Sequence, residues 1–266
     1  MLDTLERLIR ESRTFNLAQP LYQGMPMHPA HVPYCFSMNK RHHDDIYPNG
    51  ISSANDMILT SGHSGTHIDA IGHFARNGKL HRGIDALTNQ TGQRGLSVFG
   101  IETTPPILRR AILLDVASFN DVDVLDSTHE IKGDELERTA RMERVELRPG
   151  DVVFVRTGWA RYWDTPGKFC GVGVETPGPD LDGASWLVER GASLVGSDTA
   201  AFERAPRHGV VHSLLLVEKG IQIVENLNLE ELARERICKF MLFLAPLKIV
   251  GGTASPVTPV AVCAGK

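Results

Sequence analysis

Residues 61–74 read Ser61-Gly62-His63-Ser64-Gly65-Thr66-His67-Ile68-Asp69-Ala70-Ile71-Gly72-His73-Phe74, a short run of three histidines and one aspartate punctuated by glycines. The four polar side chains, His63, His67, Asp69 and His73, all occupy odd positions. In an extended chain, side chains of like parity project to the same side. A helix would instead turn Asp69 away from His63 and His67, and glycine is a poor helix former. We therefore expect an extended segment, bent at its glycines, on which these side chains converge.

Imidazole and carboxylate ligands together are typical of transition-metal sites, whereas Ca²⁺ and Mg²⁺ prefer oxygen ligands. The run is not the His-Glu-x-x-His helix of zinc proteases, and it contains no cysteine pair. The alternative interpretation is a set of surface or structural loop histidines. The whole constellation favours a divalent transition metal, Zn, Mn, Fe or Co, and leaves its identity open.

The composition indicates an ordinary globular protein. The chain has 266 residues, of which 42% are hydrophobic and 23% charged, and its net charge of −4 offers no basic field for nucleic acid or an anionic membrane. The four cysteines are far apart, which argues against a dithiol motif and fits reduced thiols in a cytosol. No apolar run approaches the ~20 residues that span a bilayer. We expect a cytoplasmic protein with a small-molecule substrate and no nucleic-acid or membrane partner.

Patterns along the chain alternate between strands and helices, which predicts an α/β fold with no internal repeat. A single domain is expected over residues 1–266, with an amphipathic N-terminal helix within 1–14. Strands are predicted at 57–60, 111–116, 151–156, 194–198, 221–224, 240–249 and 257–262. Helices are predicted at 134–143, 182–190, 212–219 and 229–236, and residues 20–36 are expected to form a proline-broken loop.

The run His63-x-Gly65-Thr66-His67-x-Asp69-x-x-x-His73-Phe74 resembles the signature of the metal-dependent cyclase family, which includes kynurenine formamidase and isatin hydrolase. Further segments resemble that family in the same order: 19–26, 155–159, 196–199 and 246–257. The resemblance implies a mixed sheet in a swivelling β/β/α fold and a homo-oligomer, either a dimer or a tetramer.

The same resemblance assigns roles to residues of the run. It implies that His63, His67 and Asp69 bind metal and that His73 is the general acid/base; as a fourth ligand, His73 would instead make the site closed and structural. It implies one or two ions per chain, Zn²⁺ or Mn²⁺, with the second ion held by Asp69 together with His212 and Glu225. The spacing from His212 to Glu225 is one residue longer than in the formamidase pattern, so Glu225 could instead pair with a base such as Arg234.

Two further residues are candidates for substrate binding. Arg156 ends an apolar strand, where it needs either a substrate oxygen or a structural carboxylate partner. Trp159 follows in the Thr157-Gly158-Trp159 turn and is either a pocket wall or part of the core. Asp198 could support a ligand imidazole or stabilise its own turn.

These observations predict a metal-dependent hydrolase that cleaves a C–N amide or lactam bond of a small aromatic or cyclic substrate. Metal-activated water would serve as nucleophile, with His73 as general acid/base. Two alternatives remain open: a lactone or ester hydrolase, and a metal-stabilised binding protein of the same fold without turnover. No nucleotide-binding glycine motif or Gly-x-Ser-x-Gly elbow occurs in the sequence.

Overall fold

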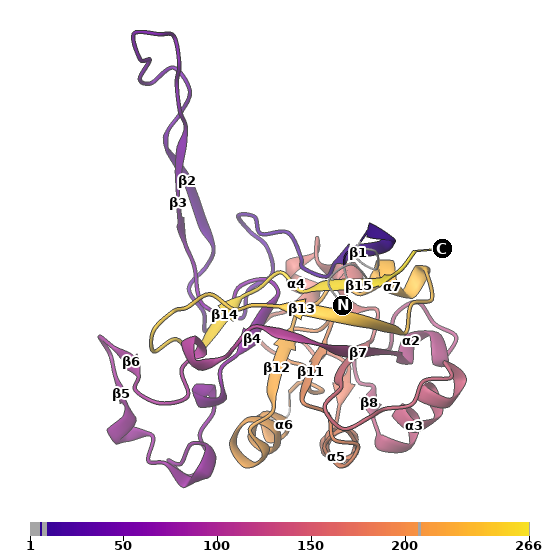
Figure 1. Ribbon diagram of the computed structural model, residues 1–266. Helices are drawn as coiled ribbons and strands as arrows, with labels where there is room; N and C mark the ends of the chain where they lie inside the picture. Colours follow the sequence, from indigo (N-terminus) through magenta and orange to yellow (C-terminus); the bar gives the residue numbers. More distant parts are fainter. Residues whose placement is uncertain (1–5, 7–9, 207–208, 266) are drawn as a thin grey trace.

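The computed structural model describes residues 6, 10–206 and 209–265, and in this part of the chain one nine-stranded mixed sheet forms the centre of the molecule (Figure 1). Its strands lie in the order β1 (Ser12–Asn16), β15 (Val260–Ala264), β13 (Lys239–Leu244), β7 (Ile107–Asp115), β9 (Val152–Arg156), β11 (Leu194–Ser197), β12 (Gln222–Glu225), β4 (His67–Asp69) and β14 (Ala254–Pro256). Strands β7, β9, β11 and β12 are parallel, and antiparallel strands flank them on both sides.

Successive side chains along the central strands point to opposite faces of the sheet, so the hydrophobic core has two layers. On β7, Ile112 and Leu114 face the helices, whereas Ala111 and Leu113 face the opposite core cluster. That second cluster joins residues from both ends of the sheet, such as Phe15 and Ile68, so the sheet curls around it. Fully buried parallel strands are apolar on both faces, which is why these segments read as continuous hydrophobic runs.

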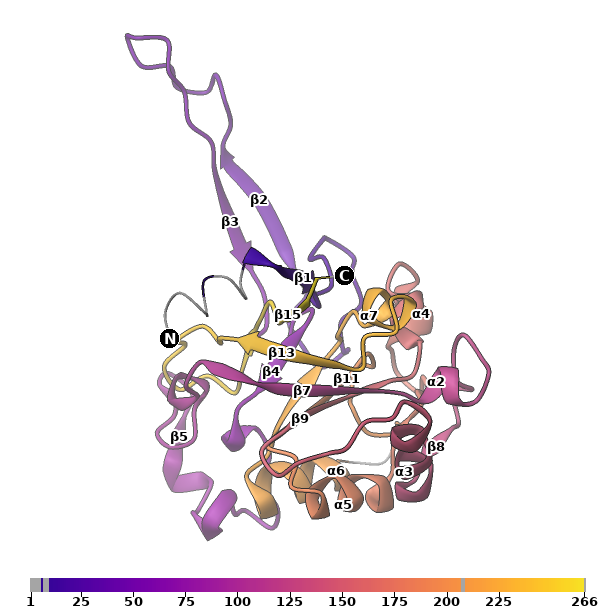
Figure 2. The same cartoon turned by 45° about the vertical axis from the view of Figure 1, so that its right-hand side comes forward.

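Helices α3 (Gly133–Met142), α5 (Leu181–Glu189) and α6 (Val210–His212), which continues as the π-helical η6 (Ser213–Lys219), cover one face of the sheet, below it in Figures 1 and 2. The other helices of the described residues are α2 (Val116–Phe119), α4 (Pro166–Phe169) and α7 (Glu230–Arg234), and Leu232 of α7 packs into the core cluster of the opposite face. The 3₁₀ turns are η1 (Ile71–His73), η2 (His81–Gly83), η3 (Leu87–Asn89), η4 (Ile101–Thr103) and η5 (Trp159–Tyr162). The loops contain two short strand pairs: β5 (Gln90–Thr91) with β6 (Gly95–Leu96), and β8 (Glu130–Ile131) with β10 (Gly178–Pro179).

The predicted single-domain α/β fold with a mixed sheet is confirmed. Most predicted strands and helices lie within a few residues of the observed bounds. The expected strand over 240–249 is too long, because β13 ends at Leu244. Most of the expected N-terminal helix within 1–14 lies outside the described residues, and its last part is wrong: Ser12 and Arg13 begin β1, which pairs with β15.

A long hairpin extends from the body of the molecule; its second strand was predicted at 57–60, whereas its first strand and the pairing of the two were not. Strand β2 (Cys35–Lys40) pairs with β3 (Asn55–Leu59) in a separate two-stranded sheet. Figures 1 and 2 both show this hairpin projecting beyond the rest of the chain. We refer to residues 35–59 as the arm. Among the described residues, no helix has the length and hydropathy that a bilayer crossing requires.

Candidate metal centre

The 61–74 run takes the extended and bent path that its composition predicts. His63 lies in the turn before β4, His67 and Asp69 lie on β4, and His73 ends η1. Gly65 makes the bend with a φ of +58°, and a Cβ there would meet Leu21 Cδ2 at 2.2 Å. Strand β4 is only three residues long, and the turn η1 follows it closely. His63 and His73, near the two ends of the run, therefore come together with ring centroids 4.2 Å apart.

Two groups of donor atoms meet at Asp69. The first is His63, His67 and Asp69, the second is Asp69, His212 and Glu225, and the ligand atoms within each group lie within 4.8 Å of one another. Asp69 Oδ1 lies 3.1 Å from His63 Nδ1, and Asp69 Oδ2 lies 3.8 Å from His212 Nε2. Asp69 therefore has one oxygen on each side and could bridge two ions.

Strand register brings the second group to the first. Glu225 on β12 stands opposite His67 on β4, and Glu225 Oε2 lies 3.3 Å from His67 Nε2. Glu225 Oε1 lies 3.1 Å from His212 Nε2. Arg234, the alternative partner considered for Glu225, pairs with Glu231 instead.

Buried polar atoms that lack a hydrogen-bond partner indicate that these two donor groups could bind a cation. All five residues are buried. Within the described residues, His67 Nε2 and both carboxylate oxygens of Asp69 complete no hydrogen bond. A buried polar group without a partner costs stability. A divalent ion among imidazole nitrogens and carboxylate oxygens would satisfy these atoms and offset the carboxylate charge.

Neighbouring groups fix which nitrogen of each histidine faces the centre. His67 Nδ1 bonds to the Gly65 carbonyl at 2.9 Å, which leaves Nε2 towards Asp69 and Glu225. His212 Nδ1 bonds to Glu203 Oε1 at 2.7 Å, and His63 Nε2 lies 3.1 Å from Thr253 Oγ1. Such partners orient metal-binding imidazoles and set their tautomers.

Protonation in this centre follows from burial and from the carboxylates. Burial lowers the pKa of His73 to about 4, although the charge of Asp69 opposes the shift. Burial alone would also lower the pKa of His212, but its bonds to Glu203 and Glu225 raise that pKa to about 10. Burial would raise the pKa of Asp69, yet the nearby histidines hold it well below its usual range.

A cavity of about 770 Å³ opens onto the centre. His63, His73, His212 and Glu225 form its polar end. Small or apolar residues from two loops form much of the remaining lining: Cys170, Gly171, Val172, Gly173, Val174, Ala200, Ala201, Ala205 and Pro206. The ring of His73 lies 4.2 Å from that of His63, so His73 stands beside the donor groups and faces the cavity. The cavity suits a small molecule with one polar, reactive end.

A model of the Cyclase family matches residues 15–204, most of the chain. The chain belongs to the Cyclase family. A kynurenine formamidase of Erythrobacter litoralis is 23% identical over 245 residues, covering 92% of this chain and 91% of that protein. A solved structure of a novel cyclase has a TM-score of 0.86 at 27% identity, covering 97% of this chain and 89% of the other. Isatin hydrolase A from Ralstonia solanacearum has a TM-score of 0.77 at 22% identity, covering 98% and 97% of the two chains.

Two residues of this Cyclase-family chain that the sequence offered as substrate-binding candidates, Arg156 and Trp159, lie away from the metal centre. Arg156 bonds to Asp115 at 2.8 Å and to Glu230 at 2.7 Å, on a different cavity that also involves Arg161. Trp159 is buried in the core, and its Nε1 donates to the Phe169 carbonyl. The structure therefore does not bring these two side chains to the metal centre.

Asp198 stabilises the backbone turn at Thr157 and Gly158 rather than the imidazole of a candidate metal ligand. Its carboxylate accepts hydrogen bonds from the Thr157 backbone N–H and hydroxyl and from the Gly158 N–H. Burial raises the pKa of Asp198 to about 6, against the effect of these donors. It thereby holds the Thr157–Gly158 turn at the end of β9.

Sequence reasoning missed several residues that contact the candidate metal ligands of this Cyclase-family chain. Glu203 and Thr253 contact the candidate ligands from loops. His31 stacks on His63 with ring centroids 5.0 Å apart and lines the cavity from the proline-rich loop. Only the position of Thr253, in the segment 246–257 that resembles the family, could have indicated a site role.

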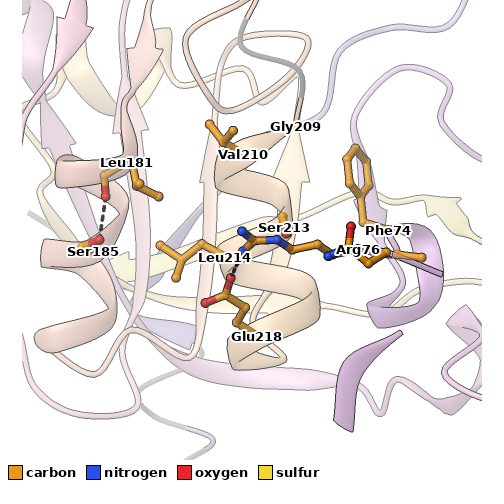
Figure 3. A pocket seen from close by; sticks show the side chains of 11 residues that line it. Phe74, Arg76, Leu181, Ser185, Gly209, Val210, Ser213, Leu214 and Glu218 are labelled. Atoms are coloured by element: carbon orange, nitrogen blue, oxygen red, sulfur yellow. Dashed lines mark hydrogen bonds and ion pairs between the residues drawn. The ribbon is translucent and has the colours of Figure 1, made fainter. Parts of the chain in front are cut away.

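A second cavity of about 530 Å³ adjoins the first, and Phe74 and Gly209 line both (Figure 3). In Figure 3, the side chains of Arg76 and Glu218 point towards one another and form an ion pair. This pair links the segment after η1 to η6. Phe74, two residues before Arg76, stacks its ring on that of His212 with centroids 4.7 Å apart.

Proposed function

We propose that this protein is a metal-dependent hydrolase that cleaves a C–N amide or lactam bond in a small aromatic or cyclic substrate. The observation that carries the proposal is the pair of donor groups that share Asp69 at the polar end of an apolar-walled cavity. The kynurenine formamidase and isatin hydrolase among its relatives support this reaction class.

In this proposal His63, His67 and Asp69 hold one divalent ion, and Asp69, His212 and Glu225 hold a second. Zn²⁺ and Mn²⁺ both suit such mixed nitrogen and oxygen donors. When bound, a divalent ion supplies an activated water and polarises the substrate carbonyl. Two ions are favoured because the two oxygens of Asp69 face different donor groups.

His73 is the proposed proton-transfer residue. It faces the cavity and lies beside His63 without belonging to either donor group. In amide hydrolysis water adds to the carbonyl carbon, the C–N bond breaks, and the leaving nitrogen must gain a proton. An imidazole at this position can accept the proton of the attacking water and deliver it to that nitrogen. The apolar wall would hold the rest of the substrate.

Metal content and turnover of matched variants test the proposal. By elemental analysis we expect about two ions per wild-type chain, about one in Glu225→Ala and none in Asp69→Ala, which removes the shared ligand. His73→Ala should keep the wild-type metal content but lose at least about 100-fold in kcat, the size expected of an acid/base residue. Substrates to assay are N-formylkynurenine and isatin.

The outcomes separate the alternatives. One ion in both wild type and Glu225→Ala would reduce the site to the first donor group. Full turnover in His73→Ala would remove the proposed acid/base. A metal-loaded chain that hydrolyses neither amides nor lactones would favour the binding protein over the enzyme.

A further inference from the structure

A cavity of about 460 Å³ lies apart from the metal centre, at the end of the sheet where β7 ends and β13 begins. Helices α2 and α7 lie at this end of the sheet in both views (Figures 1 and 2). Among the described residues, it shares no lining residue with the cavity at the metal centre. Its lining includes Leu113, Asp115, Glu143, Leu232, Arg236 and Cys238, and we refer to it as the α7 cavity. Its volume lies in the range of small-molecule sites, ~300–1,000 Å³.

The carboxyl group of Glu143 has an incomplete set of hydrogen bonds. Its Oε1 accepts the Asp115 N–H at 2.9 Å, whereas its Oε2 is buried and completes no hydrogen bond within the described residues. Burial, together with the charge of Asp115, raises the pKa of Glu143 to about 7. The neighbouring Cys238 thiol is only a weak donor, and its Sγ lies 3.9 Å from the Arg236 carbonyl oxygen. A buried acceptor without a partner costs stability, so a ligand that brings an N–H donor to Glu143 would gain affinity.

The other carboxylate of the α7 cavity already has its partners. Asp115 Oδ1 accepts from Arg156 Nη1 at 2.8 Å, and Asp115 Oδ2 accepts from Ser118 Oγ at 2.8 Å. The guanidinium of Arg156 therefore compensates the charge of Asp115 within the protein. Glu143 is left as the carboxyl of this cavity that a positively charged donor would stabilise, and hydrogen bonds to ionised groups are the stronger ones.

Arg236 gives the rim of the α7 cavity the opposite charge. Its side chain is exposed, and within the part of the chain that the structure describes its guanidinium forms no ion pair. A guanidinium matches the geometry of a carboxylate, which it can bind through two parallel hydrogen bonds. The walls also include Leu113 and Leu232, which are buried. A buried carboxyl, an exposed cation and apolar walls together suit a zwitterion with an apolar body.

We propose that the α7 cavity binds a free apolar α-amino acid. The ammonium group of the ligand donates to Glu143 Oε2, its carboxylate pairs with Arg236, and its side chain packs against Leu113 and Leu232. An amine without a carboxylate would lack the contact with Arg236. An acid without an amine would bring a further anion to Glu143. Because this site lies outside the metal centre, the proposal does not rest on the proposed hydrolase function.

Calorimetry with three related probes tests the ligand class. L-phenylalanine should bind the wild-type protein with a Kd between about 1 μM and 1 mM. Phenethylamine, which lacks the carboxylate, and 3-phenylpropionate, which lacks the amine, should each bind at least about 10-fold more weakly. Glu143 is half protonated at pH 7, and the ligand ammonium lowers its pKa, so binding should release about 0.5 proton per chain. The difference in binding enthalpy between phosphate and Tris buffers measures this release.

Matched variants locate the ligand in the α7 cavity. Glu143→Gln and Arg236→Gln should each weaken L-phenylalanine binding at least about 10-fold, and Glu143→Gln should also abolish the proton release. Glu146→Gln and Arg234→Gln are the controls, because both residues are exposed and lie outside the α7 cavity. The two controls should bind as the wild type does. Thermal unfolding without ligand reports whether each variant is folded.

Asp69→Ala separates this site from the metal centre. It should bind L-phenylalanine as the wild type does, and loss of binding would place the ligand at the metal centre and overturn the proposal. No binding up to about 10 mM, equal affinity for phenethylamine, or wild-type affinity in Glu143→Gln would overturn it too. A chain that binds L-phenylalanine through Glu143 but hydrolyses no amide would contradict the proposed hydrolase function and leave this site standing.

Discussion

Glu203 offers a sharp test of the metal centre because it touches the centre through a single imidazole. Its Oε1 lies 2.7 Å from His212 Nδ1, its Oε2 accepts the Val211 N–H at 2.8 Å, and the side chain is buried. The substitution Glu203→Gln keeps the shape and removes the charge. One of the two acceptor oxygens becomes an NH2 group, so the glutamine cannot accept from both His212 Nδ1 and the Val211 N–H, and His212 loses the charged partner that directs its Nε2 at Asp69 and Glu225.

Loss of such a carboxylate partner typically lowers metal affinity 10- to 100-fold, or about 1.4–2.7 kcal/mol. We expect this loss for the ion held by Asp69, His212 and Glu225, with a smaller effect on the ion held by His63 and His67. Chelator competition on the purified protein measures both affinities. Thermal unfolding of the same samples reports whether the variant is folded.

Glu135→Gln is the matched control. Glu135 is also buried and also pairs with a histidine, His129, at 3.0 Å, but it lies on α3. This control should leave both metal affinities unchanged. If Glu203→Gln kept wild-type affinity for both ions, or if Glu135→Gln lost as much, the inferred role of the Glu203–His212 contact would be wrong.

Three further predictions concern stability. Gly158→Ala should lower the free energy of unfolding by about 2–4 kcal/mol, because the φ of Gly158 is +80° and a Cβ there would lie 2.1 Å from the Asp123 carbonyl oxygen. Gly167→Ala is the control: a Cβ at Gly167 has open space around it, so this variant should lose little stability in the same denaturant titration. Arg156→Met should destabilise by about 3–5 kcal/mol, since it leaves the buried carboxylate of Asp115 without its cation, whereas Glu230 keeps its ion pair with Arg161. Metal content and KM of the folded enzyme should stay unchanged, and a raised KM at full stability would restore Arg156 as a substrate contact. Burial and the charge of Asp115 raise the pKa of Glu143 to about 7 from its usual 4.5, so its contribution to stability is complete below pH 4.5 and is lost as pH rises through 7. Glu143→Gln should therefore gain stability relative to wild type on going from pH 5 to pH 8, by on the order of 2 kcal/mol in urea titrations, and an equal difference at both pH values would contradict the shift.

The sequence predicts best what depends on local periodicity. The buried strands around Leu113 and Val153 read as apolar runs, and the amphipathic pattern of α3 predicts its helix to within a residue at each end. The parity of His67 and Asp69 likewise follows from the strand geometry of β4. These features depend on neighbours within a few residues, so no knowledge of the tertiary structure is needed.

Apart from the strand predicted at 57–60, the arm could not be predicted in this way, nor could the contacts of Glu203. A hairpin exposed on both faces lacks the alternation of buried and exposed residues that marks a strand, and charged residues between Lys40 and Asp45 resemble any solvated loop. Glu203 reaches His212 from an irregular loop whose path is set by tertiary packing. Arg156 was ambiguous because a lone arginine at a strand end fits a substrate or a structural carboxylate equally well, and only the partners Asp115 and Glu230 decide.

The position of Glu225 depends on the path of the chain between His212 and β12. The segment after His212 continues as the π-helical η6, whose wider turn takes one more residue between bonded groups than an α-helix does. Gly220, with a φ of +67°, then ends the helix, and Ile221 donates to the Leu215 carbonyl at 2.8 Å as the chain enters β12. A shift of one residue in β12 would turn Glu225 to the opposite face of the sheet. Since Glu225 instead stands opposite His67, we infer that the π-helical turn and the Gly220 turn together set the register that directs this carboxylate towards the donor groups.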